Sequence, residues 1–178
     1  MSLELNIQSF IQPVLYILNK AGKPLDTHKI SKILYFADRE HLAKYGTTIT
    51  DDNYIAMKYG PVPSNIYDII KVVLGKGEII PEEITNKYFE KSSPKEIGAV
   101  IGFDEDEFSK SELECLNNSL KKYLHKSFQF LTDESHDLAW NEALYDMDIL
   151  KIAKAGGADR SMLNYIKEHN ELANARFY

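Results

Sequence analysis

The chain has 178 residues, a formal net charge of −6, 44% hydrophobic residues and 27% charged residues, a composition that is typical of a globular protein and argues against general disorder. The acidic balance disfavours non-specific binding to nucleic acid, because phosphate contacts need clustered lysine and arginine, and it fits a basic protein partner better. One cysteine, Cys115, cannot form an internal disulfide or a cysteine-based zinc site.

Amphipathic helices are predicted in the first part of the chain. Apolar residues at spacings of three and four predict a helix over residues 3–19, in which Pro13 favours a kink. A second helix is predicted from an N-cap at Asp26 to Tyr45, with Gly46 as its C-terminal stop.

The next segment combines a short strand with a proline-rich break. Residues 54–59 have the length and composition of a strand, and Gly60-Pro61-Val62-Pro63 is predicted to end it. Ser64 is predicted to cap a third helix that ends before Gly75. Because its prolines fix φ and remove two backbone donors, the break is interpreted as a stiff elbow. It is either a structural joint or a rigid, exposed ridge for a partner, since rigid segments bind at a lower ordering cost.

The middle of the chain, residues 78–102, is the least regular part. Short strands are predicted at residues 79–80, 87–89 and 98–102, with a turn over residues 91–96. These strands would form a small antiparallel sheet.

The second half is again predicted to be helical. A capping box at Ser109-Lys110-Ser111-Glu112 opens a helix that runs to Leu124. Further helices are predicted over residues 128–132 after a cap at Ser127, over residues 137–145 and, beyond Gly156-Gly157, over residues 160–175. The acidic run at residues 104–107 is interpreted as a solvated loop at a helix N-terminus, or as a surface that steers a basic partner.

No repeat, low-complexity segment or linker divides the chain. The predicted fold class is mainly α (α+β): a single compact helical domain over residues 1–178, with a small antiparallel β-sheet or hairpin in the middle of the chain. A cytoplasmic location is predicted, because the start Met1-Ser2-Leu3-Glu4 does not resemble a signal peptide and no apolar run approaches the ~18 residues of a membrane span.

Two pairs of side chains are candidates for chemistry. Asp38 and His41 lie three residues apart on one face of the second helix, with Tyr45. A hydrogen-bonded polar pair at the edge of the core is favoured over an acid–base or metal role, because no second convergent carboxylate or cysteine is apparent. His136 and Trp140, four residues apart, are interpreted as a stacked pair in the core.

No catalytic residue, cofactor or metal is predicted. The sequence has no His-x-x-x-His spacing, no glycine-rich phosphate loop and no Gly-x-Ser-x-Gly elbow. Cys115 is expected off the main apolar stripe of its helix, where an inert buried thiol is favoured over a reactive one.

An ordered set of motifs gives the chain a family resemblance. The motifs are Lys32-Ile33-Leu34-Tyr35-Phe36-Ala37-Asp38, Tyr54-Ile55-Ala56-Met57-Lys58-Tyr59, Gly60-Pro61-Val62-Pro63-Ser64, Tyr67-Asp68 and the later Ser135-His136 with Ala139-Trp140. Together they resemble the Panacea antitoxin domain, also described as SocA-like or as a phage-associated GepA-type protein. The resemblance covers about residues 15–145 and leaves residues 146–178 as a helical extension. Asn65 departs from the family pattern, in which a longer or more acidic residue is usual.

The resemblance implies a binding protein that is not an enzyme. Members of the family are encoded beside a toxin, bind it and neutralise it, and one relative presents its toxin to a ClpXP protease. The implied partners are therefore a toxin encoded by an adjacent gene and a ClpXP-type protease. Some relatives carry a helix-turn-helix domain, for which there is no room ahead of Leu15, so direct DNA binding is not expected. The open alternatives are a protease adaptor or phage-associated accessory protein without its own toxin, and a hydrolase that uses Asp38 and His41.

The motif residues fall into two predicted groups. The partner-binding residues are predicted to be Tyr59, Pro61, Val62, Pro63, Ser64 and Tyr67. The structural residues are predicted to be Asp38, His41, Tyr45, Gly46, Lys58, Gly60, His136 and Trp140. The segments outside the motifs, residues 78–102 and the tail after Tyr145, are equally suited to select the partner.

Overall fold

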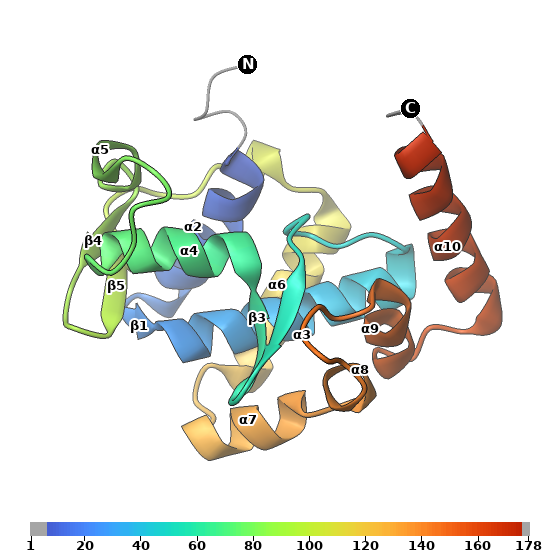
Figure 1. Cartoon of the computed structure of the whole chain (residues 1–178). Coiled ribbons are helices and arrows are strands. Elements are labelled where there is room, and N and C mark those ends of the chain that lie inside the picture. Colours follow the sequence, from blue (N-terminus) through green and yellow to red (C-terminus); the bar gives the residue numbers. More distant parts are fainter. Residues whose placement is uncertain (1–6, 176–178) are drawn as a thin grey trace.

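The structure is built around one central helix, α3. The computed structural model describes residues 7–175 and the side chains of residues 7–172 (Figure 1). Its elements are α2 (Gln8–Ala21), β1 (Leu25–Asp26), α3 (Thr27–Tyr45), β2 (Tyr54–Met57), β3 (Gly60–Pro63), α4 (Ser64–Val73), α5 (Glu82–Thr85), β4 (Phe89–Lys91), β5 (Glu96–Ala99), the 3-10 helix η1 (Glu105–Glu107), α6 (Lys110–Tyr123), α7 (Phe128–Ser135), α8 (Leu138–Asn141), α9 (Ile149–Ala155) and α10 (Arg160–Ala175).

Helix α3 is covered on all sides. Every residue from 30 to 38 is buried, as expected for a helix with apolar residues around its whole circumference. Helices α2, α6, α7 and α9 and strand β3 pack around it (Figure 1). Its predicted bounds are confirmed: the Asp26 carboxylate accepts a hydrogen bond from the Lys29 N–H, and Gly46 ends the helix with a φ of 82°.

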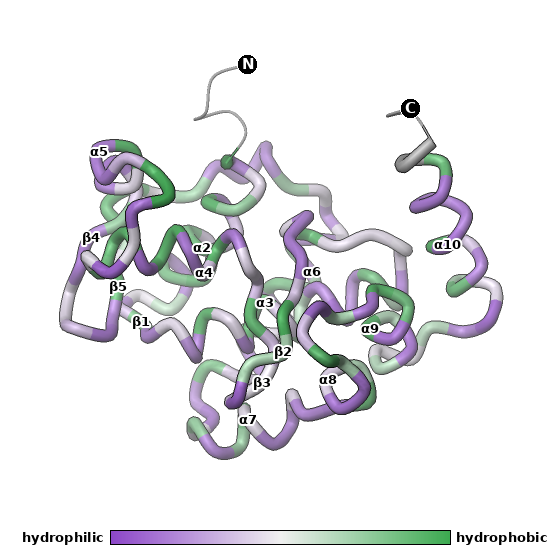
Figure 2. The backbone as a smooth tube through the Cα atoms, in the orientation of Figure 1, coloured by the Kyte–Doolittle hydropathy of each residue, from purple (hydrophilic) through white to green (hydrophobic). Residues whose placement is uncertain are grey.

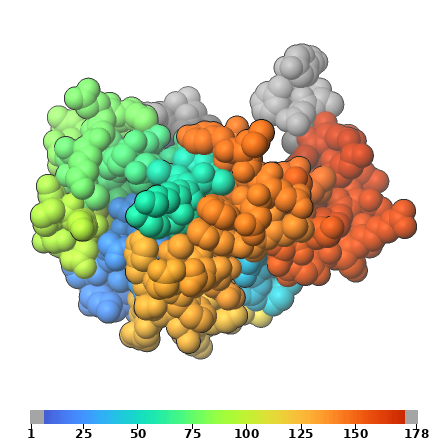
Figure 3. All heavy atoms as spheres, turned by 60° about the horizontal axis from the view of Figure 1, so that its bottom comes forward, coloured from blue at the N-terminus to red at the C-terminus, as the bar shows by residue number. Residues whose placement is uncertain are grey.

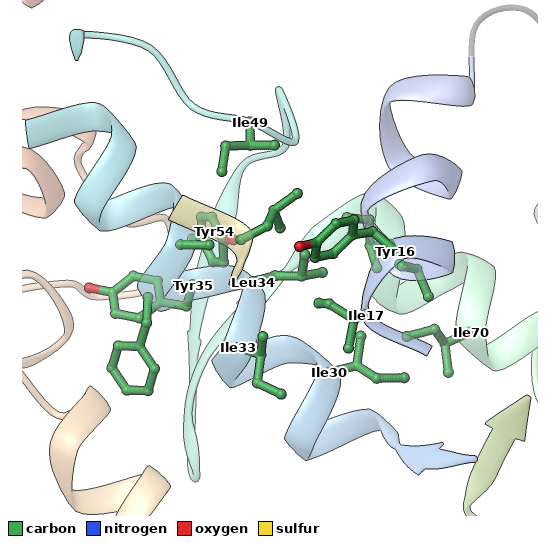
Figure 4. Close-up of a cluster of buried hydrophobic side chains, with 14 of the residues drawn as sticks. Tyr16, Ile17, Ile30, Ile33, Leu34, Tyr35, Ile49, Tyr54 and Ile70 are labelled. Carbon is green, nitrogen blue, oxygen red and sulfur yellow. The ribbon is translucent and has the colours of Figure 1, made fainter. Parts of the chain in front are cut away.

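The main apolar core lies between α2, α3 and α4. Figure 4 shows Ile17, Ile30 and Ile70 gathered between these three helices, and all three side chains are buried. Residues 8–21 form the first helix instead of the predicted 3–19, with Pro13 buried inside it, and residues 3–6 of that prediction lie outside the described residues.

The proline segment is a strand, so the predicted break at residues 60–63 is wrong. Strands β2 and β3 form an antiparallel hairpin that pairs Ala56 with Pro61 and Tyr54 with Pro63. The outer edge of β2 bonds to a distant segment, through Ala56 N–H to the Tyr145 carbonyl oxygen (2.8 Å) and Met147 N–H to the Tyr54 carbonyl oxygen (2.9 Å). Ala56 and Tyr54 therefore point their backbone groups away from β3, which puts both prolines at positions where no N–H is needed.

The predicted side-chain cap at Ser64 is also wrong, because a carboxylate from the preceding loop caps α4. Asp52 accepts hydrogen bonds from the backbone N–H groups of Asn65 (3.1 Å) and Ile66 (2.9 Å), while Ser64 makes no capping bond. The Asn65 side-chain amide also donates to Asp52 (2.9 Å). An acidic residue at position 65 would face this carboxylate, so Asn65 and Asp52 fit each other.

The predicted antiparallel sheet forms with shifted strands. β5 pairs with β4 on one side and with β1 on the other. Of the three predicted strands, residues 87–89 and 98–102 shift to Phe89–Lys91 and Glu96–Ala99, whereas residues 79–80 form a bend before α5 and no strand. The third strand, β1, has two residues, which is too short for a periodic signal.

The second half contains the predicted helices with one error. The capping box of Ser109 and Glu112 is confirmed, and α10 has the predicted bounds. The predicted helix over residues 137–145 stops at Asn141, because residues 145–147 pair with the edge of β2 instead. Helix α9 lies within the predicted helical extension, although no separate helix was predicted there, and it packs against α3. Helix α10 alternates between hydrophilic and hydrophobic residues (Figure 2).

The predicted fold class, mainly α with a small antiparallel sheet and a hairpin in the middle of the chain, is confirmed. The expected place of Cys115 off the apolar stripe is wrong: the side chain is fully buried, and burial raises the pKa of its thiol to about 12. Within residues 7–175, no helix combines the length and the apolarity needed to cross a membrane. The division into a motif-bearing part and an extension after residue 145 stays a prediction.

Candidate partner-binding site

Exposed hydrophobic side chains gather where the β2–β3 hairpin meets α7 and the loop after α8. We call this surface the hairpin face; it consists of Met57, Tyr59, Phe128, Leu144 and Tyr145. The rings of Tyr59 and Phe128 meet edge to face, with centroids 5.3 Å apart. Figure 3 shows the hairpin, in teal, against the orange segments that contain α7 and the loop after α8. Exposed apolar side chains that gather in one region mark interaction sites in soluble proteins.

A cavity opens beside the hairpin face. It measures about 280 Å³ and lies between α3, the hairpin and α4. Its lining consists of Thr27, His28, Ser31, Lys32, Met57, Lys58, Tyr59, Gly60, Val62 and Tyr67. Met57 and Tyr59 belong to both surfaces, so the cavity and the hairpin face are continuous.

A buried lysine lies at this cavity. The Lys32 side chain is 1% exposed, and its ammonium donates to the carbonyl oxygen of Pro61 (2.8 Å). Burial lowers the pKa of Lys32 to about 7. The turn of the hairpin comes close to it: a Cβ atom at Gly60, whose φ is 105°, would lie 2.7 Å from the Lys32 Cε. Only glycine suits both that φ and that approach.

Two histidines flank the lysine. The His28 ring stacks on Phe128 at 3.9 Å and its Nε2 hydrogen-bonds the Thr132 hydroxyl (3.0 Å). Burial, followed by the charge of Lys32, lowers the pKa of His28 to about 4 and also lowers that of His136. Both imidazoles are therefore neutral at pH 7.

The partner-binding residues predicted from the sequence are only partly exposed. Residues 61–63 are buried in the hairpin, so the predicted exposed proline ridge does not exist. Tyr59 is exposed at the hairpin turn, and Tyr59, Val62 and Tyr67 line the cavity. Ser64 is half-buried at the start of α4.

Asp38 lies in a buried hydrogen-bond network. It is 1% exposed and its carboxylate accepts from the backbone N–H groups of Ile49 (2.6 Å) and Thr50 (3.2 Å). The hydroxyls of Thr50 (2.6 Å) and Tyr54 (2.7 Å) bond to its other oxygen. Burial raises the pKa of Asp38 and raises that of Tyr54 well above its usual value.

His41 points to different partners. Its Nδ1 lies 2.7 Å from the Thr47 carbonyl oxygen and its Nε2 lies 3.0 Å from the Ser111 hydroxyl. No hydrogen bond joins Asp38 and His41 in the described part of the chain. Tyr45 packs its ring near His41, with centroids 4.9 Å apart. Gly46 receives the ring of Tyr165 from α10, which a Cβ atom would meet at 2.5 Å.

The His136–Trp140 stack is present, with ring centroids 3.6 Å apart and planes 7° apart. The two residues do not share a helix, because His136 caps the end of α7 and Trp140 belongs to α8. The Trp140 indole donates to the Met57 carbonyl oxygen (2.9 Å), which fastens α8 to the hairpin. Lys58 is exposed at the hairpin turn, with its ammonium 5.1 Å from the Tyr59 ring.

Lys32 and Phe128 belong to the site but were not predicted as site residues. One signal for Lys32 was available, because Ser31 and Lys32 are the only strongly polar residues in the otherwise apolar run from 30 to 37. A helix that is apolar around its circumference is buried, which makes a lysine inside it conspicuous. Phe128 gave no such signal, since its exposure depends on how α7 lies against the hairpin.

In the described residues, no three His, Cys, Asp or Glu side chains gather in a group that could hold a metal ion. The family model for the antitoxin SocA-like Panacea domain matches residues 30–141. No curated protein and no solved structure gives a significant match.

Proposed function

Because the chain belongs to the SocA-like Panacea antitoxin family, we propose that it is a cytoplasmic antitoxin that neutralises a toxin encoded by an adjacent gene through direct protein–protein contact. The hairpin face is the proposed contact surface. The observation that carries this choice is the cluster of exposed Tyr59 and Phe128 beside a cavity. Exposed aromatic residues next to a pocket are frequent anchors of protein interfaces.

A binding role suits the buried polar residues better than catalysis. Asp38 and His41 each have their own hydrogen-bond partners and are buried. A hydrolase would need a carboxylate or imidazole within reach of a substrate, and these two side chains are directed into the protein. The hydrolase alternative therefore has no support from their surroundings.

Co-expression tests the proposed function. The adjacent reading frame is expressed alone and together with this chain in the same host. We expect growth arrest in the first case and normal growth in the second, because the antitoxin occupies its toxin. A reading frame that is harmless alone, or that stays toxic in the presence of the chain, would contradict the antitoxin role. Repeating the assay in a host without ClpXP separates direct inhibition, which persists there, from a protease-adaptor role, which is lost.

Variants of the hairpin face test the proposed contact surface. Tyr59→Ala and Phe128→Ala remove two half-exposed rings, so each is expected to change the free energy of unfolding by less than about 1 kcal/mol. Each should weaken toxin binding by about 30-fold or more, because central aromatic anchors contribute 2 kcal/mol or more to an interface. Affinity is measured by calorimetry with purified toxin. Ile79→Ala, an exposed side chain before α5, is the control that keeps full affinity. If Tyr59→Ala and Phe128→Ala bind the toxin as tightly as the wild type and Ile79→Ala do, the interface lies elsewhere.

A further inference from the structure

The buried ammonium of Lys32 has no counter-charge among the described residues. Lys32 belongs to none of the ion pairs seen among the described residues, such as Arg39 with Asp137 and Lys44 with Glu40. Lys32 has one hydrogen bond, to the Pro61 carbonyl oxygen. Burying a charged group without a partner is costly. Donor hydrogens of the Lys32 side chain therefore remain without an acceptor beside the cavity, and an anion bound there would favour its charged form.

A second buried donor lies next to it. Ser31 is 1% exposed, and its hydroxyl oxygen has no hydrogen-bond partner in the described part of the structure. A serine inside a helix usually bonds back to the carbonyl oxygen one turn earlier, and this one does not. Buried polar groups without a partner are uncommon in native proteins and need an explanation. Ser31 and Lys32 both line the cavity, so a ligand there could satisfy both.

The rest of the cavity is largely apolar and small. Val62 and Met57 of the hairpin and Tyr67 of α4 supply its walls. Its volume of about 280 Å³ lies just below the ~300–1,000 Å³ of pockets that hold drug-sized molecules. This size suits one residue-sized group. The Lys32 ammonium and the Ser31 hydroxyl lie on one side of the cavity, and the other walls are apolar. A ligand that fits this lining carries an anionic hydrogen-bond acceptor on an apolar group.

We propose that the cavity receives a carboxylate carried on an apolar residue of the protein partner, with the Lys32 ammonium and the Ser31 hydroxyl as its donors. This inference rests on the proposed function, because the partner is the toxin. A protein source fits better than a free acid, since the cavity opens into the hairpin face through Tyr59. Lys58, whose ammonium lies 5.1 Å from the Tyr59 ring, adds positive charge at the same edge of an otherwise acidic chain.

Probe titrations test the cavity itself. N-acetyl-phenylalanine and its uncharged analogue N-acetyl-phenylalaninamide are titrated into the full chain, and binding is followed by NMR chemical shifts. We expect the carboxylate probe to bind at least about tenfold more tightly than the amide, because charge-assisted hydrogen bonds are about twice as strong as neutral ones. Lys32→Met should abolish this preference. Equal affinity for acid and amide, or an unchanged preference in Lys32→Met, would overturn the proposal.

A second variant tests the other proposed donor. Ser31→Ala removes a hydroxyl that bonds to nothing, so it should fold like the wild type and weaken the carboxylate probe several-fold. Two matched controls should leave probe affinity unchanged. Lys121→Met removes an exposed lysine of α6, and Ser119→Ala removes a buried hydroxyl that donates to the Ile33 carbonyl oxygen (2.6 Å). Probe binding that is unaffected in Ser31→Ala would remove that serine from the site.

Co-expression decides whether the carboxylate comes from the partner. Chains with Lys32→Met or Ser31→Ala should neutralise the toxin less well than the wild type at equal expression. If both variants neutralise as well as the wild type, the partner does not use the cavity, and the inference fails while the antitoxin role stands. If the wild-type chain itself does not neutralise the toxin, the antitoxin role is contradicted. The proposal that the carboxylate belongs to a residue of the toxin is then contradicted as well.

Discussion

Replacing Asp38 with alanine is expected to destabilise the fold by on the order of 3–5 kcal/mol, the largest single effect that we predict. The substitution leaves the buried N–H groups of Ile49 and Thr50 without an acceptor and removes the partner of the Tyr54 hydroxyl. Urea denaturation at pH 7 measures the change. Much of the loop between α3 and β2 should unfold with it, because Asp38 is what anchors that loop to the helix.

The conservative variant separates a structural role from a catalytic one. In Asp38→Asn the remaining oxygen can still accept from both backbone N–H groups, and the amide can donate to the hydroxyls of Thr50 and Tyr54. We expect a loss of no more than about 1 kcal/mol and full neutralising activity. Asp51→Asn is the control, because Asp51 is exposed in the same loop and its φ of 52° suits asparagine. A stable Asp38→Asn chain without biological activity would revive the hydrolase alternative.

Replacing Lys32 with methionine should instead stabilise the protein, by on the order of 2–4 kcal/mol at pH 7. Methionine has a similar length and fills the same buried space without a charge. The Pro61 carbonyl oxygen loses its donor, which offsets part of the gain. A chain that becomes more stable but loses the carboxylate preference is expected when a residue is kept for binding at the expense of stability.

The pH dependence identifies the cause of this stabilisation. The pKa of Lys32 is about 7 in the folded chain and its ordinary value is 10.5, so between these values the unfolded chain binds more protons. The free energy of unfolding of the wild type therefore rises with pH across this window, and the advantage of Lys32→Met shrinks toward pH 10. His28 and His136, the histidines near Lys32, have lowered pKa values and titrate below this window.

Urea denaturation of both chains between pH 7 and 10 measures this slope. Lys121→Met, which removes an exposed lysine, should follow the wild type at every pH. A stability difference between wild type and Lys32→Met that stays constant with pH would show that burial of the ammonium is not the cause.

Local signals in the sequence predicted the helices well. The cap at Asp26, the stop at Gly46 and the capping box from Ser109 to Glu112 are all present, because each depends on residues within one or two turns of the helix. The proline segment was predicted wrongly from the same kind of local signal. Pro61 and Pro63 break a helix or an inner strand, but they are tolerated in β3, where their nitrogens face away from β2.

The candidate site was harder to predict than the fold. Tyr59, Val62 and Tyr67, which the sequence motif predicts as partner-binding residues, line one cavity, and their role in binding stays a prediction. Phe128 reaches Tyr59 from a position 69 residues later in the chain. The loop that carries Leu144 was predicted to be a helix, since its edge pairing with β2 leaves no trace in its own residues.

The sequence by itself determined the family, the mainly α class and the bounds of the central helix, since these follow from motifs and periodicities in neighbouring residues. Tertiary structure alone decided the capping of α4 by Asp52, the pairing of the proline-containing strand β3 with β2, and the burial of Lys32 beside Ser31. The physical reason is the same in each case. Hydrogen-bond partners and burial depend on residues that are distant in the chain, and only the packed molecule brings them together.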